Sequence, residues 1–378
     1  MNGRTVIYAG NFELPDKNAA AHRVVNNGKL FRQLGYETVF LGVCRGERYF
    51  DGIVRREYGA GFDMYEQSYP FSSKQWAKQI FDIKNLKTLV EKYPGTAAVI
   101  LYNTQYATLL AAGKAFSGSG IRILYDCTEW NGYTEGALIK KLVKKADSKL
   151  IEAFLPRPAD GLIVVSGRMR ARYGNKKPLL LLPPLVDTQD PIWRQPAAAH
   201  SCYTFCYAGD PSNKDRLDLL IRAFSRLPAG TAALRIVGLS ADAYRTEDGS
   251  ACPAALPDSV QFAGRLSHED TVKEILSCDC FVFLREPSRR NSAGFPTKFA
   301  EAYTCGVPII TTAVSDLPLY ADEACVVLPD ASEENVLRAM EKMIACGSGP
   351  RRVKDTFDYR SHVDACGRWL ERISCTTD

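Results

Sequence analysis

CDCFVFLREPSRRNSAGFPTKFAEAYTCGVP, residues Cys278 to Pro308, contains a strand, a polar loop and a helix in that order. The apolar run CDCFVFL predicts a buried strand that ends at Leu284, and KFAEAYTC predicts a helix that stops before Gly306. Pro296 suits the start of this helix, because the first turn does not need the N–H that proline lacks. Such a strand–loop–helix unit is typical of a parallel α/β sheet.

The same stretch also carries candidate binding groups. Free N–H groups at the start of the helix attract phosphate, and Lys298 adds a full positive charge there. Gly294 allows a ligand to approach the backbone closely. Glu301 lies about one turn further on, where a carboxylate can accept hydrogen bonds from two neighbouring hydroxyls of a ribose. The pattern therefore indicates a nucleoside diphosphate site, and an ordinary solvent-facing glutamate on a surface helix is the alternative.

The βα alternation continues on both sides of this stretch. Apolar strands are predicted in RTVIYAG, ETVFLGV, AAVILY, IRILYDC and DGLIVVS, and after a break in YTFCYAG, AALRIVG and VQFAG. The break is the proline-rich segment LLLLPPLVDTQDPIWRQP, which reads as a linker between two domains. We therefore expect one α/β domain over residues 1–187, a linker over 188–197 and a second α/β domain over 198–355. The segment 240–258 is expected to be a loop, and residues 356–378 a final helix.

Composition sets the class of protein. The chain has 378 residues, of which 46% are hydrophobic and 24% charged, as in a globular protein of two domains. No window holds the roughly 18 to 20 unbroken apolar residues of a membrane span, and the first residues lack the apolar run of a secretory signal. Twelve scattered cysteines, none in a Cys-x-x-Cys pair, indicate reduced thiols. We therefore expect a cytoplasmic protein.

The charge is distributed unevenly. Residues 1–190 hold 27 lysines and arginines against 18 acidic residues, whereas residues 191–378 hold 21 against 25. Five of these lysines lie in LIKKLVKKADSKLIEAFL, residues 138–155, between apolar positions. A solvated helix that docks its leucine and isoleucine side chains on its own domain is the favoured interpretation. Peripheral contact with the inner face of an anionic membrane is the alternative. No aromatic interleaving or recognition motif supports nucleic-acid binding.

Several motifs together resemble glycosyltransferase family 4, the retaining enzymes of GT-B fold. In the C-terminal half they are YAGDPSNKDRLDLLIRAF, AGRLSHEDTVKEILSCDCFVFL and GFPTKFAEAYTCGVPIITT, and in the N-terminal half GNFELPDKNAAAHRV, YDCTEW and LPPLVD. The variant that begins Gly-Phe-Pro-Thr-Lys is similar to a branch found in capsule and exopolysaccharide gene clusters. The resemblance implies two Rossmann-like domains with parallel sheets that face a central cleft. It also implies a C-terminal helix that crosses back to the N-terminal domain.

The resemblance assigns roles by position. Glu301 would hold the ribose of the donor, and Lys214 and Lys298 would stabilise the departing diphosphate. Glu129, next to Thr128 in the YDCTEW loop, is the remaining catalytic candidate. The other implied donor-binding residues are Gly10, Asn11, Gly209, Gly264, Arg265, Asn291, Gly294, Phe295, Pro296 and Thr297.

Three positions depart from the family pattern. The first glutamate of the family's pair falls at Ala293, the histidine of the loop before Glu129 falls at Thr128, and a phosphate-binding arginine falls at Asp210. No two aspartates stand two residues apart, so the Asp-x-Asp pair of metal-dependent sugar transferases is missing. We therefore expect no metal and no other cofactor besides the nucleotide-sugar substrate.

The expected function follows from these motifs. It is the metal-independent, retaining transfer of a sugar from a nucleoside diphosphate donor, most simply UDP-linked. The acceptor would be a glycan or lipid-linked glycan in surface polysaccharide biosynthesis. A catalytically silent homologue that binds nucleotide sugar or another transferase, and a sugar-nucleotide epimerase of the same architecture, are the alternatives. A dehydrogenase is disfavoured because YAGNFELP lacks Gly-x-Gly-x-x-Gly, and a Ser-His-Asp hydrolase because the chain has four histidines.

Overall fold

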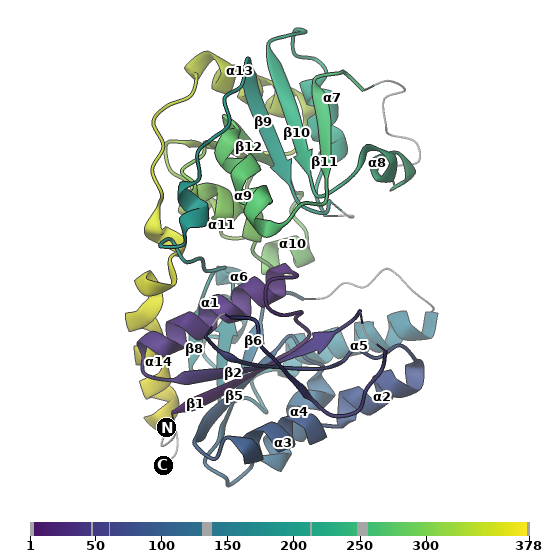
Figure 1. The fold of residues 1–378 in the computed structure, drawn as a ribbon, viewed down its shortest axis with the longest axis vertical. Helices are drawn as coiled ribbons and strands as arrows, with labels where there is room; N and C mark the ends of the chain where they lie inside the picture. The colour runs from purple at the N-terminus through teal and green to yellow at the C-terminus, as the bar shows by residue number, and fades with distance from the viewer. Residues whose placement is uncertain are drawn as a thin grey trace. The chain divides into compact units, whose positions relative to one another are not determined.

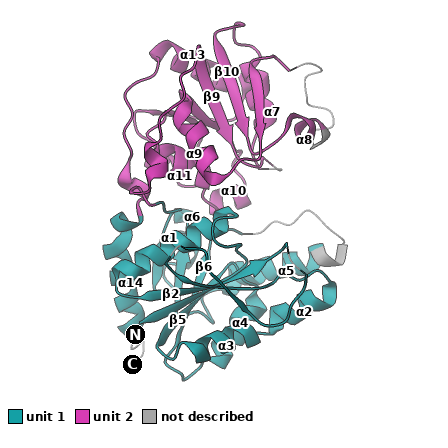
Figure 2. Cartoon of the chain, viewed as in Figure 1, with its two compact units in different colours: residues 1–186, 359–378 teal, residues 187–358 magenta. Residues whose placement is uncertain are grey.

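The computed structural model describes residues 4–46, 48–59, 61–130, 138–211, 214–247 and 256–375. It divides into two compact units, coloured separately in Figure 2. Unit 1 comprises residues 1–186 and 359–378, and unit 2 comprises residues 187–358. The segment 188–197, expected to be a linker, is thus part of unit 2. The prediction of two α/β domains with parallel sheets is confirmed.

Unit 1 contains an eight-stranded sheet in the order β3-β4-β2-β1-β5-β6-β7-β8, parallel except for β3 (Figure 1). Its elements are β1 (Thr5–Gly10), α1 (Ala19–Gln33), β2 (Glu37–Cys44), β3 (Val54–Arg56), β4 (Asp63–Ser68), α2 (Ser73–Phe81), α3 (Lys84–Lys92), β5 (Thr96–Tyr102), α4 (Tyr106–Ala115), β6 (Arg122–Cys127), α5 (Leu138–Phe154), β7 (Gly161–Val164), α6 (Gly167–Tyr173), β8 (Leu179–Leu181), η3 (Tyr359–His362) and α14 (Val363–Cys375).

The central strands of unit 1 are apolar throughout because helices cover both of their faces. Every residue of β1 and β5 is buried. Helix α1 begins where the Asn18 side chain accepts the backbone N–H of Ala21, and Gly35, at a φ of +80°, follows its end. Figure 1 shows α1 and α14 on one face of the sheet and α3 and α4 on the other.

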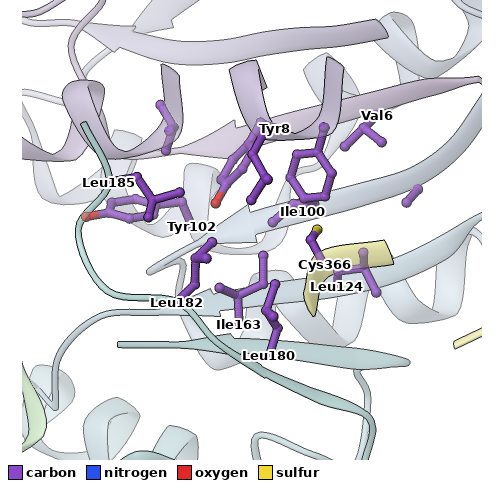
Figure 3. Close-up of a cluster of buried hydrophobic side chains, with 14 of the residues drawn as sticks. Val6, Tyr8, Ile100, Tyr102, Leu124, Ile163, Leu180, Leu182, Leu185 and Cys366 are labelled. Carbon is purple, nitrogen blue, oxygen red and sulfur yellow. The ribbon is translucent and has the colours of Figure 1, made fainter. Parts of the chain in front are cut away.

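The C-terminal helix belongs to the core of unit 1, as expected. Four side chains of α14 are buried, namely Cys366, Trp369, Leu370 and Ile373. They join the cluster of Val6, Tyr8, Ile100 and other strand residues shown in Figure 3. The indole N–H of Trp369 donates to the backbone carbonyl of Pro178 at 3.1 Å. Residues near the two ends of the chain therefore share one hydrophobic core.

Unit 2 contains a fully parallel six-stranded sheet in the order β11-β10-β9-β12-β13-β14. Its elements are η1 (Pro191–Arg194), β9 (Tyr203–Ala208), α7 (Leu217–Phe224), β10 (Ala232–Val237), α8 (Ala241–Glu247), β11 (Val260–Gly264), α9 (His268–Ser277), β12 (Cys280–Phe283), α10 (Arg289–Ala293), α11 (Thr297–Thr304), β13 (Ile309–Thr312), α12 (Leu317–Tyr320), β14 (Cys325–Leu328), α13 (Glu333–Cys346) and η2 (Asp355–Phe357).

Two helices of unit 2 differ in how clearly their local sequence marks them. Helix α9 begins where the Ser267 hydroxyl accepts the backbone N–H of Asp270 at 3.0 Å. The segment 240–258 was expected to be a loop, but Ala241–Glu247 form α8. Tyr244 of this short helix is buried and packs against Phe262 of β11, so tertiary packing stabilises a helix with weak local signals. Residues 248–255 of the same segment lie outside the described residues.

Two further sequence expectations concern the chain as a whole. Among the described residues, no helix is long and apolar enough to cross a membrane. The eleven cysteines within the described ranges are all free thiols, seven of them buried.

Candidate functional site

Three neighbouring strands of unit 2 end in glycine at the carboxyl edge of the sheet. Gly209 follows β9, Gly238 follows β10 and Gly264 ends β11, with φ of +152°, +108° and +69°. The N–H of Gly209 donates to the carbonyl of Val237 at 3.0 Å, and that of Gly238 donates to the carbonyl of Gly264 at 2.7 Å. A Cβ on Gly238 would lie 2.2 Å from the Gly209 oxygen. Gly238 therefore allows neighbouring backbone segments to pack closely, whereas Gly264 has no atom within 4 Å of where a side chain would stand, so a ligand can come close to the backbone there.

Two predicted cations lie on segments that leave this edge. Arg265 directly follows Gly264, and its side chain is exposed. Lys214 is half-buried between β9 and α7, and its backbone N–H donates to the carbonyl of Pro211 at 3.0 Å. Asp210, which stands where the family has an arginine, is exposed in the same segment. Each of these two segments thus carries a cation, and the segment with Lys214 also carries the Asp210 carboxylate.

The loop after β9 is joined to the loop after β12. The Asp215 carboxylate accepts the Tyr207 hydroxyl at 2.9 Å and the Arg285 Nε at 2.6 Å. The backbone N–H of Arg216 donates to the carbonyl of Leu284 at 2.9 Å. Burial raises the pKa of Asp215, and the Arg285 guanidinium offsets only part of this effect. This buried pair, which sequence reasoning missed, fixes the segment that carries Lys214.

The loop after β12 continues into the short helix α10. The Asn291 side chain is buried and donates to the carbonyl of Glu286 at 2.8 Å. Ala293 is fully buried. The N–H of Gly294 donates to the carbonyl of Arg290 at 3.2 Å, and its carbonyl accepts the Ser315 hydroxyl at 2.5 Å. The Gly294 N–H is therefore used by the last turn of α10 and is not available to a ligand.

Helix α11 follows directly, with Pro296 as its N-cap. No side chain caps this helix, so the backbone N–H groups of its first turn, beginning with Thr297 and Lys298, point out of the helix end. Phe295 packs its ring against Phe299 and Phe357, with centroids 6.2 and 5.8 Å apart. The aromatic contacts hold the start of α11 in place, so the role of Phe295 in the structure is packing.

Glu301 is buried in α11, with one nitrogen-bearing side chain near each of its two carboxylate oxygens. Its Oε2 lies 2.7 Å from the Lys298 Nζ, and its Oε1 lies 3.6 Å from the His268 Nε2. Burial alone would raise the pKa of Glu301, but Lys298 and His268 outweigh it and lower the pKa to about 2. Glu301 is therefore not a solvent-facing residue of a surface helix, and its carboxylate is charged at neutral pH.

His268, the partner of the second Glu301 oxygen, is another residue that sequence reasoning missed. Its side chain is only 19% exposed because it lies between Glu301 and the ring of Trp193. The imidazole and indole centroids are 6.3 Å apart in an edge-on arrangement. The available signal was its position one residue after the Ser267 cap, at the end of the loop that starts with Gly264.

The N-terminal candidates lie in unit 1. Gly10 ends β1, and a Cβ there would lie 2.5 Å from the carbonyl oxygen of Tyr102, so only glycine fits. Asn11 follows it and is half-buried. Glu129 is half-buried after β6, and its backbone carbonyl accepts the Cys127 thiol at 3.9 Å. These three residues therefore lie at the carboxyl ends of β1 and β6 in unit 1.

A buried polar network lies next to Gly10 and Glu129 along β1 and β6. The Asp126 carboxylate accepts the Arg23 Nη2 at 2.8 Å and Nε at 2.9 Å, and the Tyr8 hydroxyl at 2.5 Å. Arg23 also donates to the carbonyls of Leu182 and Pro183. An aspartate inside the apolar strand IRILYDC was the signal, because a buried carboxylate requires such partners. The network ties α1 to the sheet.

Comparisons with known proteins agree with this architecture. Residues 202–346 match the family described as glycosyl transferases group 1. No curated protein sequence matches the chain significantly. A solved glycosyltransferase from Rickettsia africae has a TM-score of 0.68 at 10% identity, covering 100% of both chains.

Two more solved structures are similar over nearly the whole chain. The apo form of the lipopolysaccharide outer core galactosyltransferase WaaB has a TM-score of 0.62 at 14% identity, covering 97% of this chain and 99% of that one. HepE from Anabaena, solved in complex with UDP-glucose, has a TM-score of 0.63 at 12% identity with the same coverage. The chain therefore has the GT-B fold, and the residues that match the glycosyl transferases group 1 family all lie in its unit 2.

Proposed function

We propose that the protein is a retaining glycosyltransferase that uses a nucleoside diphosphate sugar, UDP-linked, without a metal ion. The acceptor is a glycan or a lipid-linked glycan presented at the inner face of a membrane during surface polysaccharide assembly. Retention and the family 4 assignment rest on the sequence motifs. The observation that carries the proposal is the buried, charged Glu301 between Lys298 and His268 in α11.

The arrangement in unit 2 suits such a donor. The glycine-lined strand ends offer a flat backbone surface for the base, and the remaining lone pairs of Glu301 can accept two ribose hydroxyls. Holding the carboxylate ionised by Lys298 makes these hydrogen bonds charge-assisted and therefore stronger. That HepE was solved with UDP-glucose supports a UDP-linked donor in the same fold.

Breaking the bond between the sugar and the diphosphate leaves negative charge on the departing UDP. In the proposed complex the N–H groups of the first turn of α11 and the cations Lys214 and Lys298 stabilise this charge. Lys298 can donate to a phosphate oxygen and to Glu301 together, because an ammonium has three N–H donors. With no Asp-x-Asp pair in the sequence, these groups replace the metal ion of other transferases. The acceptor hydroxyl bonds to the anomeric carbon as the bond to the diphosphate breaks, and it passes its proton to the departing diphosphate oxygen.

A catalytically silent nucleotide-sugar-binding homologue is the second candidate, and two observations favour it. Ala293 is buried where the family has a sugar-binding glutamate. Thr128 stands at the family's histidine position, and its hydroxyl accepts the Asn103 amide at 2.5 Å. Neither side chain can act as an acid or base.

One assay distinguishes these candidates. The protein is incubated with a panel of UDP- and GDP-sugars, and nucleotide release and sugar interconversion are measured with and without EDTA. Release from a UDP-sugar that persists in EDTA is expected, whereas binding of UDP with no release from any donor would identify the silent homologue. Interconversion without release would identify an epimerase, and abolition by EDTA would refute metal independence.

A matched pair of variants tests the leaving-group assignment. Lys298→Met is expected to lower turnover by about 10²- to 10³-fold, the usual effect of removing a group that stabilises developing charge. Lys342→Met, at an exposed position on α13, is the control and should keep wild-type turnover. Equal turnover of the two variants would remove Lys298 from the mechanism.

A further inference from the structure

Helix α5 of unit 1 turns an apolar stripe outward. Leu142, Val143 and Leu150 are 60%, 55% and 40% exposed. Because positions three, four and seven residues apart share a helix face, Val143 and Leu150 lie on one side, with Leu142 beside them. The sequence favoured a helix that docks its leucine side chains inward, and for Leu142 and Leu150 this expectation is wrong.

The opposite side of α5 is fixed to unit 1. Ile151 and Leu155 are buried, and the backbone carbonyl of Ile151 accepts the Tyr173 hydroxyl at 3.4 Å. The Asp147 carboxylate accepts the backbone N–H of Tyr106, the first residue of α4, at 2.8 Å. The outward stripe is therefore held on a docked helix.

Two neighbouring helices also carry exposed apolar side chains. Helix α4 packs against both α2 and α5, and the Thr108 hydroxyl donates to the carbonyl of Ile80 at the end of α2 (Figure 1). Phe71 before α2 is 60% exposed, Phe81 at its end 69%, and Leu110 of α4 47%. Six of the nine exposed large hydrophobic side chains of the described residues thus lie on or beside these three helices, which we call the α2–α4–α5 surface.

Lysines predominate among the charged residues of these three helices. Helices α2, α4 and α5 contain eight lysines and two acidic residues, Asp147 and Glu152. One of these acids, Asp147, already accepts the Tyr106 N–H. Lys145 and Lys149 are exposed next to the apolar stripe of α5. Apolar side chains flanked by lysines are the combination that inserts into the headgroup region of an anionic bilayer.

We propose that the α2–α4–α5 surface docks on the surface of an anionic lipid bilayer. The apolar side chains enter the acyl boundary, and the lysines contact acidic headgroups. The inference deepens the proposed function, on which it rests for its purpose of bringing the protein to a membrane-presented acceptor. Lipid binding itself requires no sugar transfer, so the two can fail separately.

The test is co-sedimentation of the full chain with vesicles of phosphatidylcholine alone and of phosphatidylcholine with phosphatidylglycerol. Wild type should bind the anionic vesicles and lose binding as salt is raised. Lys145→Glu with Lys149→Glu should weaken binding by at least about tenfold, since each lysine near such a surface contributes about fivefold. Leu142→Gln with Val143→Gln should also weaken it, because the apolar contact is lost.

Matched exposed residues of unit 2 provide controls. Leu319→Gln, at a leucine that is 80% exposed, and Lys273→Glu with Lys342→Glu should bind vesicles like wild type. All variants should keep wild-type melting and nucleotide release from a donor sugar. Equal binding of wild type and the α5 variants, or no preference for anionic vesicles, would overturn the proposal. Self-association of the wild type without lipid, lost in Leu142→Gln with Val143→Gln, would assign the surface to a second copy instead.

Vesicle binding and donor turnover are measured on the same samples. Binding through α5 with no turnover of any donor would refute the proposed function and leave the lipid surface standing. Turnover of a donor sugar without vesicle binding would refute the lipid-docking proposal and leave the proposed function standing.

Discussion

Replacing Glu301 with glutamine tests the centre of the candidate site, because the substitution removes one charge and keeps the shape of the side chain. In the wild type, the carboxylate lies 2.7 Å from the Lys298 Nζ and 3.6 Å from the His268 Nε2, in a buried position. Glutamine can still accept one hydrogen bond from Lys298 but leaves its charge without a counter-ion. We expect both the stability of the protein and its affinity for UDP to fall.

The size of the stability effect follows from the pKa of Glu301. The folded protein lowers this pKa from 4.5 to about 2. At 1.36 kcal/mol for each pKa unit, this difference corresponds to about 3 kcal/mol of stability at neutral pH. Because the pKa of this acid is depressed in the folded state, the contribution is present above pH 4.5 and is lost as the pH falls through about 2. Glu301→Gln should therefore destabilise the protein by about 1 to 3 kcal/mol.

Chemical denaturation from pH 7 down to pH 3 measures this effect, with Glu341→Gln as control, since Glu341 is exposed on α13. The stability difference between wild type and Glu301→Gln should shrink as the pH falls below about 4.5. Calorimetry at pH 7 should show UDP binding weakened by about 1 to 3 kcal/mol, the cost of losing a charged hydrogen bond. A stability difference that does not change with pH would refute the electrostatic account. Unchanged UDP affinity would refute the ribose assignment.

Three further substitutions test other parts of the structure. Trp369→Ala should destabilise unit 1 by about 3 to 5 kcal/mol in urea, because it empties a core position and frees the Pro178 carbonyl, and wild-type unfolding would contradict the docking of α14. Arg285→Leu should lower the free energy of unfolding by about 3 to 5 kcal/mol, because it leaves the Asp215 carboxylate without its partner. Adding Asp215→Asn removes this unpaired charge and should recover part of the lost stability, whereas additive losses in the double variant would contradict the ion pair. Ala293→Glu should lower the melting temperature by several degrees, because it buries a carboxylate, and should change the relative rates among UDP-sugars. An unchanged melting temperature would show that position 293 is not packed, and an unchanged donor ranking would show that it does not line the sugar site.

The architecture was predictable because parallel strands and their helices leave a simple pattern. Apolar runs such as AAVILY and YTFCYA are buried on both faces, so the positions of β5 and β9 follow from hydrophobicity alone. Helix starts were predictable where a cap was visible, as at Ser267. Helix α8 was not predictable, because its stability comes from the contact of Tyr244 with Phe262, eighteen residues further along the chain.

The candidate site was predictable in its sequence order and not in its contacts. GFPTKFAEAY places Pro296, Lys298 and Glu301 on one helix start, and the structure has them there. The sequence does not show which of these side chains already have an ion-pair or hydrogen-bond partner within the protein, because those partners lie far along the chain. His268 reaches Glu301 across 33 positions, and Arg285 reaches Asp215 across 70.

These contacts change how the motif itself should be understood. A lysine and a glutamate three residues apart on a helix usually form a weak, exposed pair worth a few tenths of a kcal/mol. Here Glu301 is buried, and a histidine from another helix meets its second oxygen. Burying a carboxylate is unfavourable unless its surroundings keep it charged, and α9 and α11 together do so. A fold that needed only packing at this position would place an apolar side chain there. The retained charge is therefore the strongest single reason to look for a ligand with hydroxyl groups at the start of α11.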